Sequence, residues 1–91
     1  MAAHPVPDTA LLEQQLVVLL RERLLETAAP LNAGTDLYSV GLDSMAIMQL
    51  LILVEEEYGV SLPEDVLTRE NFSTARQLAR LVRAEIGTVH T

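Results

Sequence analysis

The sequence lacks cysteine, lysine and tryptophan, and it contains a single phenylalanine. Without cysteine, disulfide bonds and thiolate metal sites are excluded. All basic residues are arginines, and these six stand against thirteen acidic residues, which gives a formal net charge of −7. A nucleic-acid-binding role would require this negative field to attract a negative polymer, so we exclude that class of function.

Long apolar runs are also missing. No run approaches the roughly 18 residues that a membrane-spanning helix requires. The first eight residues have neither the basic start nor the apolar stretch that is typical of a secretory leader. The sequence therefore predicts a cytoplasmic protein that does not enter a membrane.

The residues that are present suffice for one folded domain. Hydrophobic residues make up 49% of the 91 residues, which is enough to form a single core. We expect a disordered arm over residues 1–7, which holds two prolines, a domain over residues 8–87 and a short tail over residues 88–91. Leucines at three- and four-residue steps predict a first helix that begins at Asp8 or Thr9 and ends near Glu26.

A long loop is predicted after this helix, because Pro30, Gly34 and Gly41 interrupt any apolar period. The apolar side chains of the loop should hold it against the core: Leu31, Leu37, Tyr38, Val40 and Leu42.

The second helix is predicted to begin at Asp43 or Ser44, since either side chain can accept a hydrogen bond from an unpaired backbone N–H. Gly59 should end it in the left-handed conformation. Leu50, Val54 and Tyr58 repeat at four-residue intervals and form its expected inward stripe.

Two further helices complete the predicted fold. Pro63 suits the first turn of a short helix through about Arg69, and Phe72 should anchor the following link to the core. A last helix should begin at Ser73 or Thr74, with Thr74 as its cap, and end at Gly87. The stripe of this helix is Leu78, Leu81, Val82 and Ile86, and Arg76, Arg80 and Arg83 share its outer face. We therefore expect an all-α, four-helix bundle with three longer helices, one short helix and a long first loop.

Ser44, at the junction of the long loop and the second helix, is the candidate functional residue. A serine before an apolar run is most often only a helix cap. A nucleophilic serine would need a base, yet the two histidines, His4 and His90, lie at the chain ends, and no G-x-S-x-G motif is present. The sequence therefore does not favour catalysis by Ser44, whereas the positive end of a helix is a favourable place for a phosphate ester.

The wider pattern around Ser44 resembles a known family. The segment Leu42-Asp43-Ser44-Met45 is followed by Leu50-Leu51 and by Glu55-Glu56-Glu57-Tyr58-Gly59-Val60. Over roughly residues 8 to 86 the chain resembles the acyl and peptidyl carrier proteins. This resemblance implies that Ser44, flanked by Asp43, receives 4′-phosphopantetheine from CoA through a phosphopantetheinyl transferase. It also implies that the thiol of this arm carries cargo as a thioester, so that the protein is a carrier and not an enzyme.

A partner-binding surface is predicted on the second helix, because the inward stripe is already filled. Its residues are Met45, Met48, Gln49, Ile52, Glu55 and Glu56. The span from Leu24 to Thr68 holds eight acidic residues and no basic one. This acidic span is either a docking surface for basic patches of enzymes or simply a solvated face. The expected partners are a loading enzyme that transfers acyl or aminoacyl groups and a downstream synthase or acyltransferase, with the carrier itself a monomer.

The class of carrier and a rival function stay open at this point. Ala46 and Gln49 stand where fatty-acid carriers often have acidic residues, so the second helix is more similar to that of aminoacyl carriers, including D-alanyl carriers. We expect a free-standing carrier of a specialised polyketide or nonribosomal-type pathway, with the cargo undetermined. The alternative is a small acidic helical adaptor without a prosthetic group, in which Ser44 is only a cap.

Overall fold

A computed structural model describes residues 8–25 and 30–89, with side chains described as far as Ile86. It contains three α-helices and four short helical turns. In chain order the elements are α1 (Thr9–Leu19), η1 (Leu20–Leu24), η2 (Leu37–Val40), α2 (Ser44–Tyr58), η3 (Glu64–Val66), η4 (Glu70–Phe72) and α3 (Ala75–Val89). The all-α prediction is confirmed, while the predicted arm over residues 1–7 and the last two residues of the predicted tail lie outside the described residues.

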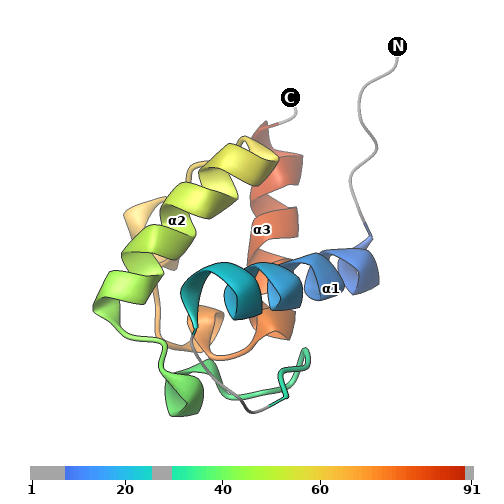
Figure 1. Ribbon diagram of the computed structural model, residues 1–91. Coiled ribbons are helices and arrows are strands. Elements are labelled where there is room, and N and C mark those ends of the chain that lie inside the picture. The colour runs from blue at the N-terminus through green and yellow to red at the C-terminus, as the bar shows by residue number, and fades with distance from the viewer. Residues whose placement is uncertain (1–7, 26–29, 90–91) are drawn as a thin grey trace.

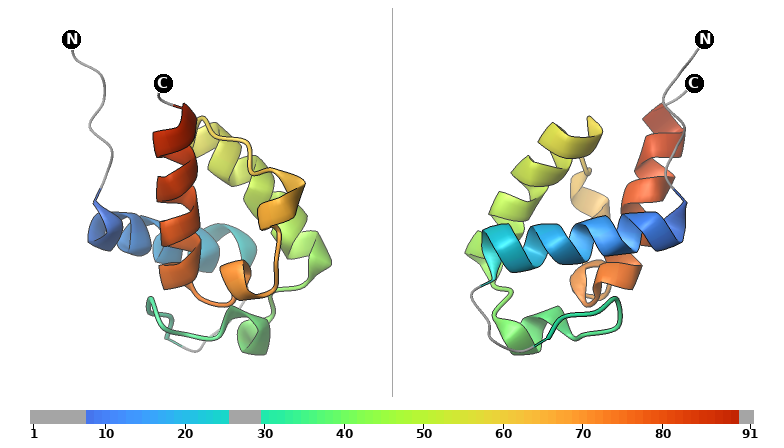
Figure 2. Two further views of the ribbon diagram at one scale, coloured as in Figure 1. Left: turned by 180° about the vertical axis from the view of Figure 1, so that it is seen from behind. Right: turned by 45° about the vertical axis from the view of Figure 1, so that its right-hand side comes forward.

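The helices are arranged so that α1 crosses the other two (Figures 1 and 2). α2 and α3 begin at the same end of the molecule and run in the same general direction, with α1 packed against α3 and η1 packed against α2. One apolar core lies between them, and no polar or charged residue of the described part is buried in it. Its largest fully buried side chains are Phe72, Leu12, Leu16, Leu20, Leu37, Leu50 and Leu78.

The first helix begins as predicted, because the Asp8 carboxylate accepts a hydrogen bond from the backbone N–H of Leu11 at 2.8 Å. Its final turn is wider than the sequence suggested. Residues Leu20–Leu24 form a π-helical turn, which the Leu25 N–H closes on the Leu20 carbonyl oxygen at 2.8 Å. A π turn adds one residue per turn, and here it places both Leu20 and Leu25 in the core. The predicted end near Glu26 lies outside the described residues.

The long loop is held against the core, as predicted. Leu31, Leu37 and Leu42 are buried, and Tyr38 and Val40 pack partly against the core. Backbone hydrogen bonds also tie the loop to the start of α3: the Leu37 N–H donates to the Ser73 carbonyl and the Arg76 N–H donates to the Ala33 carbonyl. The segment that leads into α2 is therefore a fixed part of the fold.

The prediction of a continuous short helix over 63–69 is wrong in detail. The structure has two separate 3-10 turns, η3 and η4, and Pro63 precedes η3 in an extended conformation instead of entering it. The Asn71 amide donates to the Val66 carbonyl at 2.8 Å and joins the two turns. Phe72 is fully buried, which confirms it as the anchor of this link.

The last helix begins as predicted and extends further than predicted. The Thr74 hydroxyl accepts a hydrogen bond from the Gln77 N–H at 3.1 Å. Gly87 does not end the helix, which continues to Val89. A glycine inside a helix costs only about 1 kcal/mol relative to alanine, so the helix can pass through it.

Candidate functional site

Ser44 is the first residue of α2, and its neighbours determine how it is presented. Asp43 is the cap of the helix: its carboxylate accepts a hydrogen bond from the Ala46 N–H at 2.9 Å, and its carbonyl accepts one from the Ile47 N–H at 2.9 Å. Leu42 is buried, and Gly41 adopts a positive φ of 113°, so the chain turns into the helix at a defined point. The capping role that the sequence left open between Asp43 and Ser44 therefore belongs to Asp43.

The Ser44 hydroxyl is exposed, and it has no hydrogen bond within the described part of the chain. The other serines differ. The hydroxyls of Ser39 and Ser73 donate to the carbonyls of Asp36 and Glu70, and that of Ser61 donates to the Glu55 carboxylate, each at 2.7 Å. Ser44 is thus the serine whose hydroxyl is available for attachment without the loss of an internal contact.

The surroundings of this hydroxyl suit a phosphate ester. Ser44 and Met45 occupy the first two positions of the helix, where backbone N–H groups have no partner within the helix. These N–H groups and the positive end of the helix dipole favour a negative charge at this point. The described residues include no histidine or cysteine, and no group of three potential metal ligands occurs among them.

The predicted partner residues lie together on the outer side of α2. Met45, Met48 and Ile52 are 71%, 61% and 55% exposed, and Gln49, Glu55 and Glu56 are exposed as well. The opposite side of the helix is buried through Ala46, Leu50 and Val54. We call Met45, Met48 and Ile52 the apolar ridge; its exposure agrees with the sequence analysis, and its role stays a prediction.

Tyr58 and Glu55 of α2 differ in detail from what the sequence predicts. Tyr58 is half-buried, and its hydroxyl donates to the Gln15 side chain at 2.9 Å. Burial raises the pKa of this hydroxyl, and the neighbouring Glu57 carboxylate adds to the effect. Glu55, predicted to face a partner, already accepts the hydrogen bond from Ser61.

A contact that the sequence does not predict fixes the loop before Ser44. The Arg69 guanidinium lies 4.0 Å from the centre of the Tyr38 ring, and the Tyr38 hydroxyl donates to the Arg69 carbonyl at 3.1 Å. This contact joins η2 to the turn before η4. No local pattern could have revealed it, because the two residues lie 31 positions apart.

Comparisons with known proteins agree with this geometry. The family model described as "Phosphopantetheine attachment site" matches residues 14–82, which is more than half of the chain. Aminoacyl carrier protein 2 of Bradyrhizobium diazoefficiens is 27% identical over 77 residues, which cover 82% of this chain and 86% of that protein. The actinorhodin polyketide synthase acyl carrier protein of Streptomyces coelicolor is 36% identical over 77 residues, which cover 75% of this chain and 86% of that protein.

A solved structure supports the same conclusion about the fold. A chain in the crystal structure of Bradyrhizobium japonicum glycine:carrier protein ligase complexed with glycylated carrier protein matches with a TM-score of 0.60 and 27% identity. The match covers 80% of this chain and 95% of that chain. No helix among the described residues is long and apolar enough to cross a membrane. The chain therefore belongs to the phosphopantetheine-binding carrier proteins, whose members carry cargo for enzymes and are not themselves enzymes.

Proposed function

We propose that 4′-phosphopantetheine is attached to this carrier protein at Ser44. The observation that carries the proposal is the difference between the four serines: three hydroxyls donate internal hydrogen bonds, and that of Ser44 is exposed without one. Asp43 supports the attachment indirectly, because it caps α2 and keeps the backbone N–H groups of Ser44 and Met45 at the helix start. When bound, the group supplies a thiol on which cargo is held as a thioester.

We further propose an aminoacyl or related acyl group as the cargo. The aminoacyl reading rests on the similarity to aminoacyl carrier protein 2 and to the chain from the glycine:carrier protein ligase complex. The polyketide acyl reading rests on the Streptomyces relative, which has the higher identity. We propose that this protein acts as a monomer in a specialised biosynthetic pathway in the cytoplasm, with a loading ligase or transferase and a downstream synthase or acyltransferase as its partners.

The apolar ridge on α2, with Gln49, Glu55 and Glu56 beside it, is the proposed surface for these enzymes. Exposed apolar side chains that lie together on one helix mark an interaction surface more often than single exposed residues do. Methionine is adaptable, which suits successive contacts with different enzymes. The Glu55 carboxylate is engaged by Ser61, so Glu56 is the better candidate for a direct contact with a basic partner.

The attachment is tested by incubating the protein with CoA and a broad-specificity phosphopantetheinyl transferase and measuring intact mass. We expect one phosphopantetheine increment on the wild type, mapped to Ser44 by fragmentation, and none on Ser44→Ala. Ser39→Ala, Ser61→Ala and Ser73→Ala are the matched controls and should each accept one increment. An increment on Ser44→Ala, or one mapped to another serine, would refute the assignment.

A further inference from the structure

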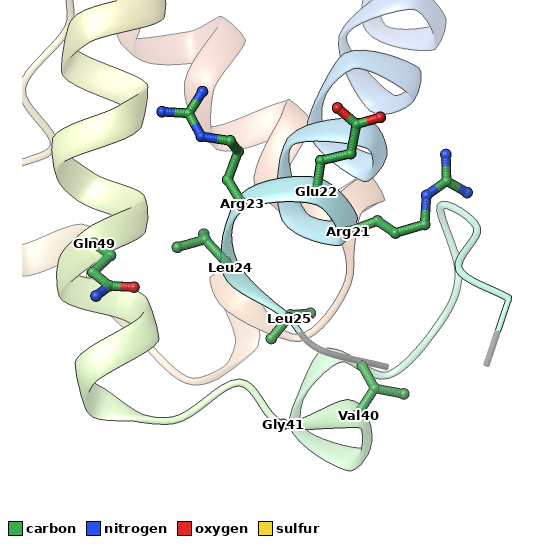
Figure 3. A pocket seen from close by; sticks show the side chains of 8 residues that line it. All are labelled: Arg21, Glu22, Arg23, Leu24, Leu25, Val40, Gly41 and Gln49. Carbon is green, nitrogen blue, oxygen red and sulfur yellow. The ribbon is translucent and has the colours of Figure 1, made fainter. Parts of the chain in front are cut away.

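A pocket of about 650 Å³ lies beside the attachment helix, between the end of the first helix and α2 (Figure 3). Its apolar wall includes Leu24, Leu25 and Val40, of which Leu25 is buried and the other two are half-buried. Gln49 borders it on the side of α2, and Figure 3 shows the Leu24 side chain directed from η1 toward that helix. A volume of this size is large enough to receive a side chain of another protein.

Two arginines line the same pocket. Arg21 and Arg23 are exposed, and neither forms an ion pair with another described residue, although Glu22 stands between them in the sequence. In Figure 3 their side chains leave η1 in different directions, and that of Arg23 extends on the side of α2. Figure 3 thus places the Arg23 side chain on the α2 side of the pocket, where it extends away from Val40 and Gly41.

The pocket borders the segment that leads to Ser44. Val40 and Gly41, which line it, lie four and three residues before Ser44 in the fixed segment that leads into the helix. Gln49 also connects the pocket to the apolar ridge, because Met48, the residue before Gln49, belongs to that ridge.

We propose that the phosphopantetheinyl transferase of this carrier inserts a carboxylate side chain into this pocket, where Arg23 binds it and Arg21 adds a weaker attraction. This inference rests on Ser44 being the attachment site. Arginine presents a planar fork that matches a carboxylate. Because Glu56 offers the opposite charge further along α2, the two charges together would also fix the direction in which the enzyme lies on the helix.

The test compares charge reversals of three exposed arginines. Kinetics of modification by the transferase should show that Arg23→Glu raises KM for the carrier by about tenfold with kcat unchanged, and that Arg21→Glu raises it less. Arg80→Glu changes the net charge equally on the outer face of α3, and we expect it to change KM by less than about twofold. Arg23→Lys should give an intermediate KM, because it keeps the charge and loses the fork.

Thermal unfolding of each variant shows whether a raised KM reflects weaker docking or a loss of folding. Arg23→Gln should also raise KM for the carrier, and it introduces no new negative charge. Equal KM values for Arg23→Glu and Arg80→Glu would overturn the pocket proposal and leave total charge as the cause. A wild-type protein that accepts no phosphopantetheine would instead refute the proposed function, so the two failures are distinguishable.

Discussion

α2 and α3 are both 15 residues long, and they differ in what they expose and not in what they bury. Each places a stripe of fully buried side chains in the same core, with Leu50 and Val54 on α2 and Leu78 and Val82 on α3. On its outer side α3 carries Arg76, Arg80 and Arg83, whereas α2 carries Met45, Met48 and Ile52.

This difference agrees with the proposal that α3 only supports the fold whereas α2 also meets other proteins. The outer arginines of α3 are hydrated, so their exposure does not reduce the stability of the fold. Two of them also contact α1: Arg76 lies 4.0 Å from the Glu13 carboxylate, and Arg83 donates to the Thr9 hydroxyl at 3.1 Å. The apolar ridge of α2 has no such partner within the described residues. Since folding gains nothing from an exposed apolar side chain, its presence beside Ser44 is best explained by binding.

The buried faces of α2 and α3 should contribute about equally to the free energy of unfolding. Leu50→Ala and Leu78→Ala each remove a fully buried leucine from the shared core, so each should lower the free energy of unfolding by about 2 to 5 kcal/mol. Urea denaturation followed by circular dichroism measures both. If one variant lost less than about 1 kcal/mol, the two helices would not contribute equally to a single core.

The outer faces should behave differently when their residues are exchanged. Ile52→Arg should weaken binding to a loading or modifying enzyme by about tenfold, because a desolvated apolar contact near the arm is lost. Arg80→Ile, the reciprocal change on α3, should leave binding within about twofold of the wild type. Surface plasmon resonance gives the affinities, and thermal unfolding should show both variants folded. If Arg80→Ile weakened binding more than Ile52→Arg did, the docking surface would lie on α3 and not on α2.

The smallest expected effects come from removing the N-terminal caps of α2 and α3. Asp43→Ala and Thr74→Ala each remove one side-chain hydrogen bond to the helix start and should each cost about 0.5 to 2 kcal/mol of stability. Only Asp43→Ala should also slow the modification of Ser44, since it loosens the first turn of α2. Modification rates measured well below the unfolding temperature test this, and equal rates for the two variants would show that the cap does not position the serine.

Much of the fold was predictable because the deciding interactions are local. The Asp43 cap, the left-handed Gly59 and the four-residue spacing of Leu50 and Val54 act within one or two turns of the chain. Phe72 is predicted as the anchor of the link before the last helix, and the structure buries it fully.

The features that the sequence did not predict arise from local backbone geometry or from contacts between distant segments. The π turn at Leu20–Leu24 arises because Leu20 and Leu25 both reach the core, which the helical period alone does not require. The link over 63–69 forms two turns because Leu67, at φ −84° and ψ 65°, leaves the helical conformation. The pocket with Arg23 joins residues of three elements, so no single stretch of sequence could indicate it.

The division of roles between Asp43 and Ser44 has a consequence for how the protein matures. Because Asp43 supplies the capping hydrogen bond and the Ser44 hydroxyl donates none within the described residues, acquiring the prosthetic group removes no interaction that the folded state uses. By linkage, modification then costs the fold no internal contact, and the phosphate ester gains the favourable field of the helix start in the folded state, so we expect the modified form to melt at the same temperature as the unmodified form or slightly above it. The newly synthesised chain can fold completely first and wait in its final shape for the transferase.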